Sequence, residues 1–225
     1  MTGLVRWRAW AGVVLLGLTF GQSAVADPTS YLENGKTYYR PATLQTSQLR
    51  GWEQLSDERK ALIRHALTIP KQHGWLKYRF GGATPQAGGF DCSGAMYFVL
   101  RGLGFKIPRS SAQQYLWLKD AGNIHPIPAG VSRLDHSSFS LLTPGDLLFW
   151  SGTYRPTDGR KVNISHVSIY LGQEKDGRHV MIGATKGRSY RGKRGDGYGV
   201  YDFKLPAKTS RAKFIGYGPP VGLKK

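Results

Sequence analysis

The chain has a single cysteine, Cys92, among its 225 residues. One cysteine cannot form an intrachain disulfide, and it excludes a zinc site built from several thiolates. Acidic residues are also scarce, because 14 Asp and Glu stand against 32 Lys and Arg, giving a formal net charge of +18. Nucleic acid, an anionic membrane or an anionic wall polymer would all attract such a charge, so composition alone does not select a partner.

Length and hydrophobic content limit the architecture. The 225 residues, of which 40% are hydrophobic, are enough for one domain with a core and few for two. That hydrophobic fraction is too high for a disordered polybasic chain. The sequence contains no internal repeat and no low-complexity tract.

The N-terminal segment has the layout of a secretory signal peptide. Two arginines precede an apolar run over residues 10–20, and the small residues Ala24 and Ala26 follow before Asp27. The run has only about ten to twelve residues, whereas a membrane-spanning helix needs roughly 20. No cysteine stands directly after the run for lipid attachment. We therefore expect cleavage of residues 1–26 near Ala26, and a periplasmic or secreted mature protein with a net charge of about +16.

Helical patterns precede strand patterns along the rest of the chain. We expect residues 27–50 to be a loosely ordered lead-in. Helices are predicted over 56–69 with an end at Pro70, from Cys92 to about 104, and from Ser110 to about 122. A two-residue period predicts strands at 146–151, 166–171, 179–184, 198–203 and 212–217. Helices followed by strands indicate an α+β fold with a mostly antiparallel sheet.

Cys92 lies in the segment FDCSG, at the start of the second predicted helix. Unpaired N–H groups and the positive end of the helix dipole favour a thiolate there, so we expect the pKa of Cys92 to be lowered. A thiol nucleophile also needs a base, usually histidine. His166 opens a predicted strand and shares one face with Ser168, and His179 opens the next strand in the same way. The residues alone leave open whether Cys92 is a nucleophile or an inert buried thiol.

Four sequence motifs follow one another along the chain: YRFGGATPQAGGFDCSG, IPRSSAQQY, LTPGDLLFW and SHVSIYLG. Across roughly residues 75–185 the chain resembles the NlpC/P60 peptidases, which are papain-like cysteine hydrolases of bacterial cell-wall peptides. The resemblance implies N-terminal helices packed on a mostly antiparallel sheet of five to six strands. It implies a catalytic domain over residues 51–220, without a cofactor or metal.

The resemblance also implies roles for particular residues. Cys92 would be the nucleophile and His166 the general base of an endopeptidase that cleaves next to γ-D-glutamyl residues in peptidoglycan stem peptides. Tyr78, Asp91 and Ser93 would line the substrate pocket, where Asp91 and Ser93 could hold a free amine. Asp91 could equally cap the helix through its carboxylate. Arg109 and Ser110 could also reach the cleft, although Ser110 is already explained as a helix cap.

One position departs from the family pattern. The third catalytic residue, often histidine, is expected on the strand after the base, where this chain has Gly183. Four other residues could orient the ring of His166 instead: His179, Thr185, Asn163 and Ser165. The departure leaves open a wall-binding or regulatory protein with little turnover. A separate alternative keeps the enzyme and makes it an amidase acting on a different amide.

A basic, glycine-rich stretch over residues 186–199 is expected to form a loop, with five Lys and Arg between 186 and 194. It is either a solvated loop or a surface attracted to anionic envelope polymers. Nucleic acid is not an expected partner, because an exported chain without a nucleic-acid-binding motif has little access to it. Peptidoglycan peptides remain the expected substrate, and the oligomeric state is undetermined by the sequence.

Overall fold

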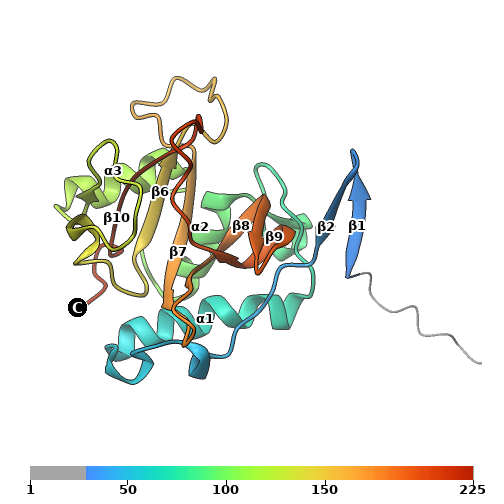
Figure 1. Cartoon of the computed structure of the whole chain (residues 1–225), viewed down its shortest axis with the longest axis horizontal. Helices are drawn as coiled ribbons and strands as arrows, with labels where there is room; N and C mark the ends of the chain where they lie inside the picture. The colour runs from blue at the N-terminus through green and yellow to red at the C-terminus, as the bar shows by residue number, and fades with distance from the viewer. Residues whose placement is uncertain (1–28, 225) are drawn as a thin grey trace, which may run out of the picture.

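The computed structural model describes residues 29–224, so the predicted signal peptide lies outside the described residues (Figure 1). Three α-helices occur in this range: α1 (Asp57–His73), α2 (Cys92–Gly102) and α3 (Ser111–Asp120). The strands of the described residues are β1 (Ser30–Glu33), β2 (Lys36–Tyr39), β3 (Ala83–Thr84), β4 (Gly89–Phe90), β5 (His125–Pro126), β6 (Leu147–Ser151), β7 (His166–Gln173), β8 (His179–Tyr190), β9 (Lys193–Asp202) and β10 (Lys213–Gly218).

Eight of these strands form one sheet in the order β1-β2-β9-β8-β7-β6-β10-β5. Neighbouring strands are antiparallel except β2 and β9, which pair in parallel through Tyr39 and Gly195. The α+β class and the mostly antiparallel sheet are therefore confirmed. The sheet has more strands than the five or six predicted, because the β1–β2 hairpin and the short β5 extend its two ends.

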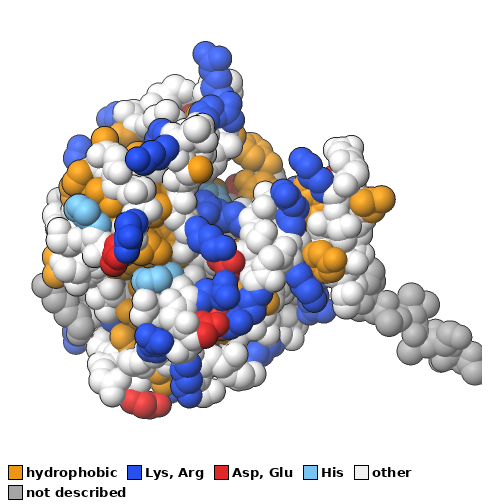
Figure 2. Space-filling view, in the orientation of Figure 1, with side chains coloured by type: hydrophobic (Ala, Val, Ile, Leu, Met, Phe, Trp, Pro, Cys, Tyr) orange, Lys and Arg blue, Asp and Glu red, His pale blue; other side chains and the backbone are white. Residues whose placement is uncertain are grey.

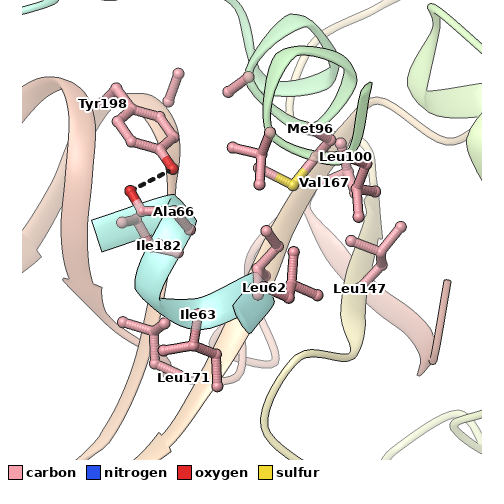
Figure 3. Packing of buried hydrophobic residues seen from close by; sticks show 14 of the residues in the cluster. Leu62, Ile63, Ala66, Met96, Leu100, Leu147, Val167, Leu171, Ile182 and Tyr198 are labelled. Carbon is pink, nitrogen blue, oxygen red and sulfur yellow. Dashed lines mark hydrogen bonds between the residues drawn. The ribbon is translucent and has the colours of Figure 1, made fainter. Parts of the chain in front are cut away.

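The main core lies between the helices and one face of the sheet (Figure 3). Leu62 and Ile63 of α1 and Met96 of α2 are fully buried there, and they pack with Val167 and Ile182 of the central strands. A 3.6-residue period on the helices meets a two-residue period on the strands, which is the pattern that the sequence predicts. The contact of α2 with β7 brings Cys92 toward His166 across 73 intervening residues.

The opposite face of the sheet carries a second, largely aromatic cluster. Trp150, Tyr170 and Phe203 are buried there and pack ring against ring. Because side chains alternate along β7, His166 lies on this aromatic face, and its ring centroid is 5.4 Å from that of Trp150. The base candidate is thus held by a strand buried on both faces.

Helix α1 does not end at Pro70 as predicted, and it continues to His73. Proline lacks the N–H that would bond the carbonyl oxygen four residues earlier, that of Ala66. The hydroxyl of Tyr198 donates to that oxygen at 3.0 Å instead (Figure 3). A donor from a distant strand thus replaces the missing one, and the helix ends at Gly74, whose φ is +70°.

The stretch predicted as a basic loop forms a β-hairpin. Strand β8 extends to Tyr190, β9 begins at Lys193, and these two residues pair across a two-residue turn. The turn residues Arg191 and Gly192 both have positive φ, which is typical of a type I′ turn. Of the glycines that suggested a loop, Gly192 lies in the tight turn, Gly187 lies at a shift in strand register, and the others lie within β9. The loop prediction is wrong.

The lead-in expected to be loosely ordered is structured over its described residues. Strands β1 and β2 form a hairpin beside β9 (Figure 1). Leu44 and Leu49 are buried in the main core. No helix between residues 29 and 224 combines the length and apolar character needed to cross a bilayer.

Candidate functional site

Cys92 is the first residue of α2, and Asp91 is the residue that caps the helix. One carboxylate oxygen of Asp91 accepts from the N–H of Gly94 at 2.6 Å, and the other accepts from the N–H of Gly81 at 2.9 Å. The close packing leaves no room for a side chain at Gly94, because a Cβ there would lie 2.0 Å from the carbonyl oxygen of Gly82. The capping role considered for Asp91 is confirmed, and the YRFGG and FDCSG motifs are parts of one compact turn around the thiol.

The thiol faces the start of β7. The Sγ atom of Cys92 lies 3.9 Å from the carbonyl oxygen of Ser165, the residue directly before His166. Cys92 is only 5% exposed and His166 only 6%. The two candidate catalytic residues are therefore brought to one place, at the edge between the helix layer and the aromatic face of the sheet.

The expected lowering of the thiol pKa is wrong for this structure. Burial, followed by the charge of Asp91, raises the pKa of Cys92 to about 11. Backbone N–H groups of Val167 and Ser93 act in the predicted direction, but their effect is smaller than that of burial. At neutral pH the group is accordingly a thiol, and it would have to lose its proton to a base to act as a nucleophile.

His166 is suited to accept that proton. Burial lowers the pKa of its imidazole well below the usual 6.5, and the nearby cation of Arg188 lowers it further. The guanidinium of Arg188 lies 4.4 Å from the ring centroid of Trp150, which packs against the imidazole. The ring is therefore neutral near pH 7 and has a lone pair available.

A pocket with a volume of about 260 Å³ opens beside the thiol. The predicted substrate-binding residues Tyr78, Asp91 and Ser93 line it with Cys92, so the structure brings all four together. The other lining residues are Phe80, Arg109, Ser110, Ser111, Tyr154, Asp158 and Arg160. Larger cavities elsewhere contain no cysteine, so the chemistry and not the size selects this one.

Arg109 holds the carboxylate of Asp91 at one wall of the pocket. Its two terminal nitrogens lie 3.0 Å and 2.9 Å from the two oxygens of Asp91, a bidentate arrangement. The hydroxyl of Ser93 donates to the same carboxylate at 3.2 Å, and Arg109 donates to Ser93 at 3.0 Å. Asp91 is thus shared between the helix cap and a cation, which the sequence did not indicate.

The polar insert between β6 and β7 supplies another wall. Tyr154 packs edge-on against Phe80 with ring centroids 6.0 Å apart, and Arg160 donates to the hydroxyl of Tyr154 at 2.9 Å. Phe80 is 76% exposed, so a large apolar ring stands at the pocket rim. These contacts could not be predicted from the sequence, where Phe80 and Tyr154 are simply aromatic residues on either side of Cys92.

None of the four residues considered for orienting His166 forms a hydrogen bond with its ring within the described residues. Both ring nitrogens of His179 are engaged, by Tyr170 at 2.6 Å and Gln173 at 2.7 Å. Ser165 bonds Thr153 through its hydroxyl, and Asn163 is exposed. Thr185 is buried, and within the described residues no hydrogen bond joins it to the imidazole.

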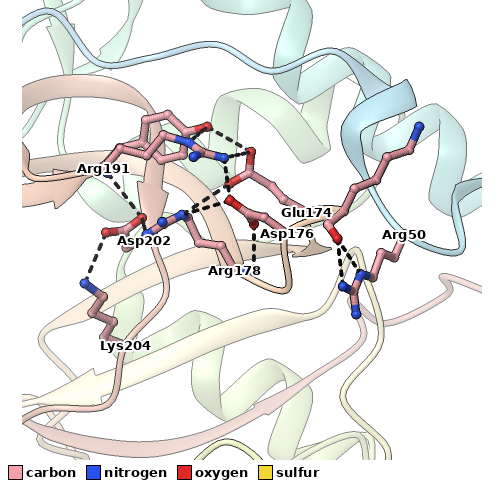
Figure 4. A network of polar contacts seen from close by, with 9 residues as sticks. Arg50, Glu174, Asp176, Arg178, Arg191, Asp202 and Lys204 are labelled. Atoms are coloured by element: carbon pink, nitrogen blue, oxygen red, sulfur yellow. Dashed lines mark hydrogen bonds and ion pairs between the residues drawn. The ribbon is translucent and has the colours of Figure 1, made fainter.

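Part of the basic stretch is neutralised within the protein. Arg191 pairs with Glu174 at 3.0 Å and with Asp176 at 2.9 Å, and Arg178 joins the same network (Figure 4). Lys186 forms an ion pair with Glu33 of the β1–β2 hairpin. The wider surface is still rich in Lys and Arg with few acids (Figure 2). The stretch therefore links the β8–β9 hairpin to neighbouring segments as well as adding to the basic surface.

Comparisons with known proteins show what the chain is similar to. The model of the NlpC/P60 family matches residues 74–196. A gamma-DL-glutamyl hydrolase of Bacillus subtilis is 36% identical over 98 residues, which cover 43% of this chain and 18% of that protein. The murein DD-endopeptidase MepH of Escherichia coli is 32% identical over 126 residues, covering 54% of this chain and 39% of that protein.

A solved NLP/P60 family structure from Staphylococcus aureus shares 22% identity and a TM-score of 0.44, covering 80% of this chain and 43% of that chain. The chain spans less than half the length of each of these proteins.

Proposed function

The chain belongs to the NlpC/P60 family, and on that premise we propose that it is a cysteine endopeptidase of peptidoglycan stem peptides. Cys92 is the nucleophile, His166 is the general base, and the bond cleaved lies next to a D-γ-glutamyl residue. The observation that carries the proposal is the position of the thiol, at the first turn of α2, against the residue before His166 and beside the pocket. The relatives named as glutamyl hydrolase and endopeptidase support the substrate class.

The reaction proceeds by acyl transfer. The neutral imidazole of His166 takes the proton of the Cys92 thiol as Sγ bonds to the scissile carbonyl carbon. The imidazolium then gives this proton to the leaving amine, and the carbon–nitrogen bond breaks to leave a thioester. Water attacks the thioester with His166 as base, and proton return to sulfur releases the acid and regenerates the thiol.

Two backbone donors are available for the oxyanion. The first helix bond of α2 runs from the N–H of Ala95 to the carbonyl of Asp91, so the N–H groups of Cys92 and Ser93 are not used by the helix. Such fixed donors stabilise the negative oxygen of a tetrahedral intermediate most effectively where water is excluded. The buried position of Cys92 supplies that condition.

The compartment forms part of the proposal. Peptidoglycan lies outside the cytoplasm, which agrees with the export signal expected in residues 1–26. Sequencing the N-terminus of the protein recovered from the producing cell tests this point. A chain that begins at Asp27 supports export, whereas an intact N-terminus in the cytoplasm contradicts it.

A second candidate function is binding of cell-wall peptides without efficient turnover. The specific observation in its favour is Gly183, which offers no side chain to hold His166. An amidase acting on a different amide would keep the chemistry and change the substrate. Both alternatives are separated from the proposal by what the protein releases.

The test is digestion of purified peptidoglycan, with products identified by mass spectrometry. Wild-type protein should release fragments cut after the D-γ-glutamyl residue, and Cys92→Ala should lower the rate at least about a thousandfold. Equal pelleting of both proteins with the wall, with identical product profiles, would support binding alone. Cuts at another amide that depend on Cys92 would support the amidase.

A further inference from the structure

His166 needs a group that fixes its ring, and Gly183 does not supply one. A catalytic imidazole works in one tautomer and one orientation, usually set by a hydrogen bond to the nitrogen that does not face the nucleophile. We propose that Ser168 is the positioning residue of His166, acting from the same strand in place of a residue on β8. The inference rests on the proposed function for its kinetic meaning, and on the structure alone for the contact.

The contact comes from strand geometry. Ser168 follows His166 by two residues on β7, so both side chains lie on the aromatic face. The hydroxyl oxygen of Ser168 is 3.4 Å from Nε2 of His166, and Ser168 is 1% exposed. Ser168 makes no other side-chain hydrogen bond within residues 29–224, so its hydroxyl is available to the ring. Burial on this face keeps water from competing for the same nitrogen.

Gly183 is explained by the same serine. A Cβ built on Gly183 would lie 2.7 Å from Oγ of Ser168 and 3.2 Å from its Cβ. The φ of Gly183 is not in the left-handed region, so its backbone does not require glycine. Glycine is needed there because Ser168 occupies the space between the two strands. The departure from the family pattern at 183 and the serine at 168 are therefore two parts of one arrangement.

In the proposed arrangement the two ring nitrogens have different roles. With the proton on Nε2, the ring donates to Oγ of Ser168, and Nδ1 carries the lone pair. Nδ1 makes no hydrogen bond within the described chain, so it is the nitrogen free to take the proton of the thiol. When the imidazolium forms, the Nε2–H bond to the serine becomes charge-assisted and shorter. Ser168 therefore acts mainly on the charged states of the reaction and little on substrate binding.

The remaining groups around the ring do not provide this bond. Trp150 packs on the imidazole, but its indole N–H is buried without a partner and is a donor only. Arg188 is also a donor only, and its charge disfavours the imidazolium. Ser168 has the hydroxyl that lies within hydrogen-bond distance of Nε2, at 3.4 Å.

The first experiment is Ser168→Ala, measured with a γ-D-glutamyl stem peptide. We expect kcat to fall about tenfold or more, with KM changed less than about twofold. Tyr170→Phe is the matched control, because it removes another buried hydroxyl from the same face of β7, one that contacts His179. The control should keep kcat. Wild-type kcat in Ser168→Ala across the pH profile would overturn the proposal.

The second experiment moves the orienting group to the next strand. Gly183→His alone should lose activity, because its Cβ meets Ser168. Ser168→Gly combined with Gly183→His opens that space and should recover at least tenfold over Gly183→His alone. If the double variant is no more active than either single variant, the idea that the side chains at 168 and 183 compete for the same space is contradicted.

A third readout does not depend on turnover. Nitrogen-15 NMR of the histidine rings should show His166 of the wild type protonated on Nε2, and a mixture of tautomers in Ser168→Ala. The signals of His179 should not move. If the wild type shows this pattern but cleaves no peptide, the proposed function fails while the positioning role stands. An unchanged His166 signal in Ser168→Ala rejects the positioning role whatever the activity.

Discussion

The hydrogen bond from Tyr198 to Ala66 should be a measurable source of stability, because it supplies the donor that Pro70 lacks. Both partners are buried, with Tyr198 1% exposed and Ala66 0%. Tyr198→Phe removes only the hydroxyl and leaves the carbonyl oxygen of Ala66 without its partner inside the core. The ring also packs at 5.6 Å against Phe90, close to Asp91 and the thiol.

The magnitude follows from the burial. An unsatisfied buried acceptor costs about 1–3 kcal/mol, so the free energy of unfolding should fall by that amount in Tyr198→Phe. For a chain of this size, each kcal/mol corresponds to roughly 2–4 °C in melting temperature. The change in apolar contact is negligible because the ring is retained, so the slope of a urea titration should be unchanged.

A double-mutant cycle with Pro70→Ala isolates the mechanism. Alanine at position 70 restores an N–H four residues after Ala66, so Tyr198→Phe should cost at least about 0.5 kcal/mol less in that background. Urea unfolding of the four proteins, followed by circular dichroism, measures this coupling. Equal costs of Tyr198→Phe in both backgrounds would refute the reasoning, since the hydroxyl would then not be replacing the proline N–H.

Three further outcomes concern the site. Arg188→Gln removes a cation that lowers the pKa of His166, so the acid limb of the pH profile of kcat/KM should move to higher pH. An acid limb with its midpoint at or below that of the wild type would contradict this. The thiolate of Cys92 should form only toward pH 11, so the rate of its alkylation by iodoacetamide should be low at pH 7 and should still increase at pH 10. A rate that reaches its plateau by pH 8 would contradict this expectation. Gly94→Ala places a Cβ 2.0 Å from the carbonyl oxygen of Gly82, so it should lower the free energy of unfolding by about 1–3 kcal/mol and also lower kcat. Unchanged urea unfolding would show that the backbone of the turn shifts to accommodate the methyl group.

Local patterns predicted much of the fold. The helix at Cys92, the cap at Ser110 and the central strands are set by short-range period and capping residues, and the structure contains them. The extent of α1 beyond Pro70 could not be predicted in this way. Its missing donor comes from Tyr198, which is 132 residues from Ala66 along the chain.

The candidate site was likewise predictable only in part, because some of its properties are local and others depend on the tertiary structure. The order of the motifs implied that Cys92 and His166 lie close together, and in the structure the thiol of Cys92 lies against Ser165, the residue before His166. The pKa of Cys92 was predicted in the wrong direction because a helix N-terminus is a local property and burial is a tertiary one. Ser168 was visible as a neighbour of His166 on one face, but its relation to Gly183 appears only when β7 and β8 are paired.

The most direct test of the central claim is trapping of the acyl-enzyme. Cleavage of a γ-D-glutamyl stem peptide in the presence of hydroxylamine should give the hydroxamate of the acyl product, because hydroxylamine competes with water for a thioester on Cys92. Cys92→Ala should form neither hydroxamate nor acid. Cleavage by the wild type that yields only the acid at every hydroxylamine concentration, or cleavage that persists in Cys92→Ala, would contradict the account.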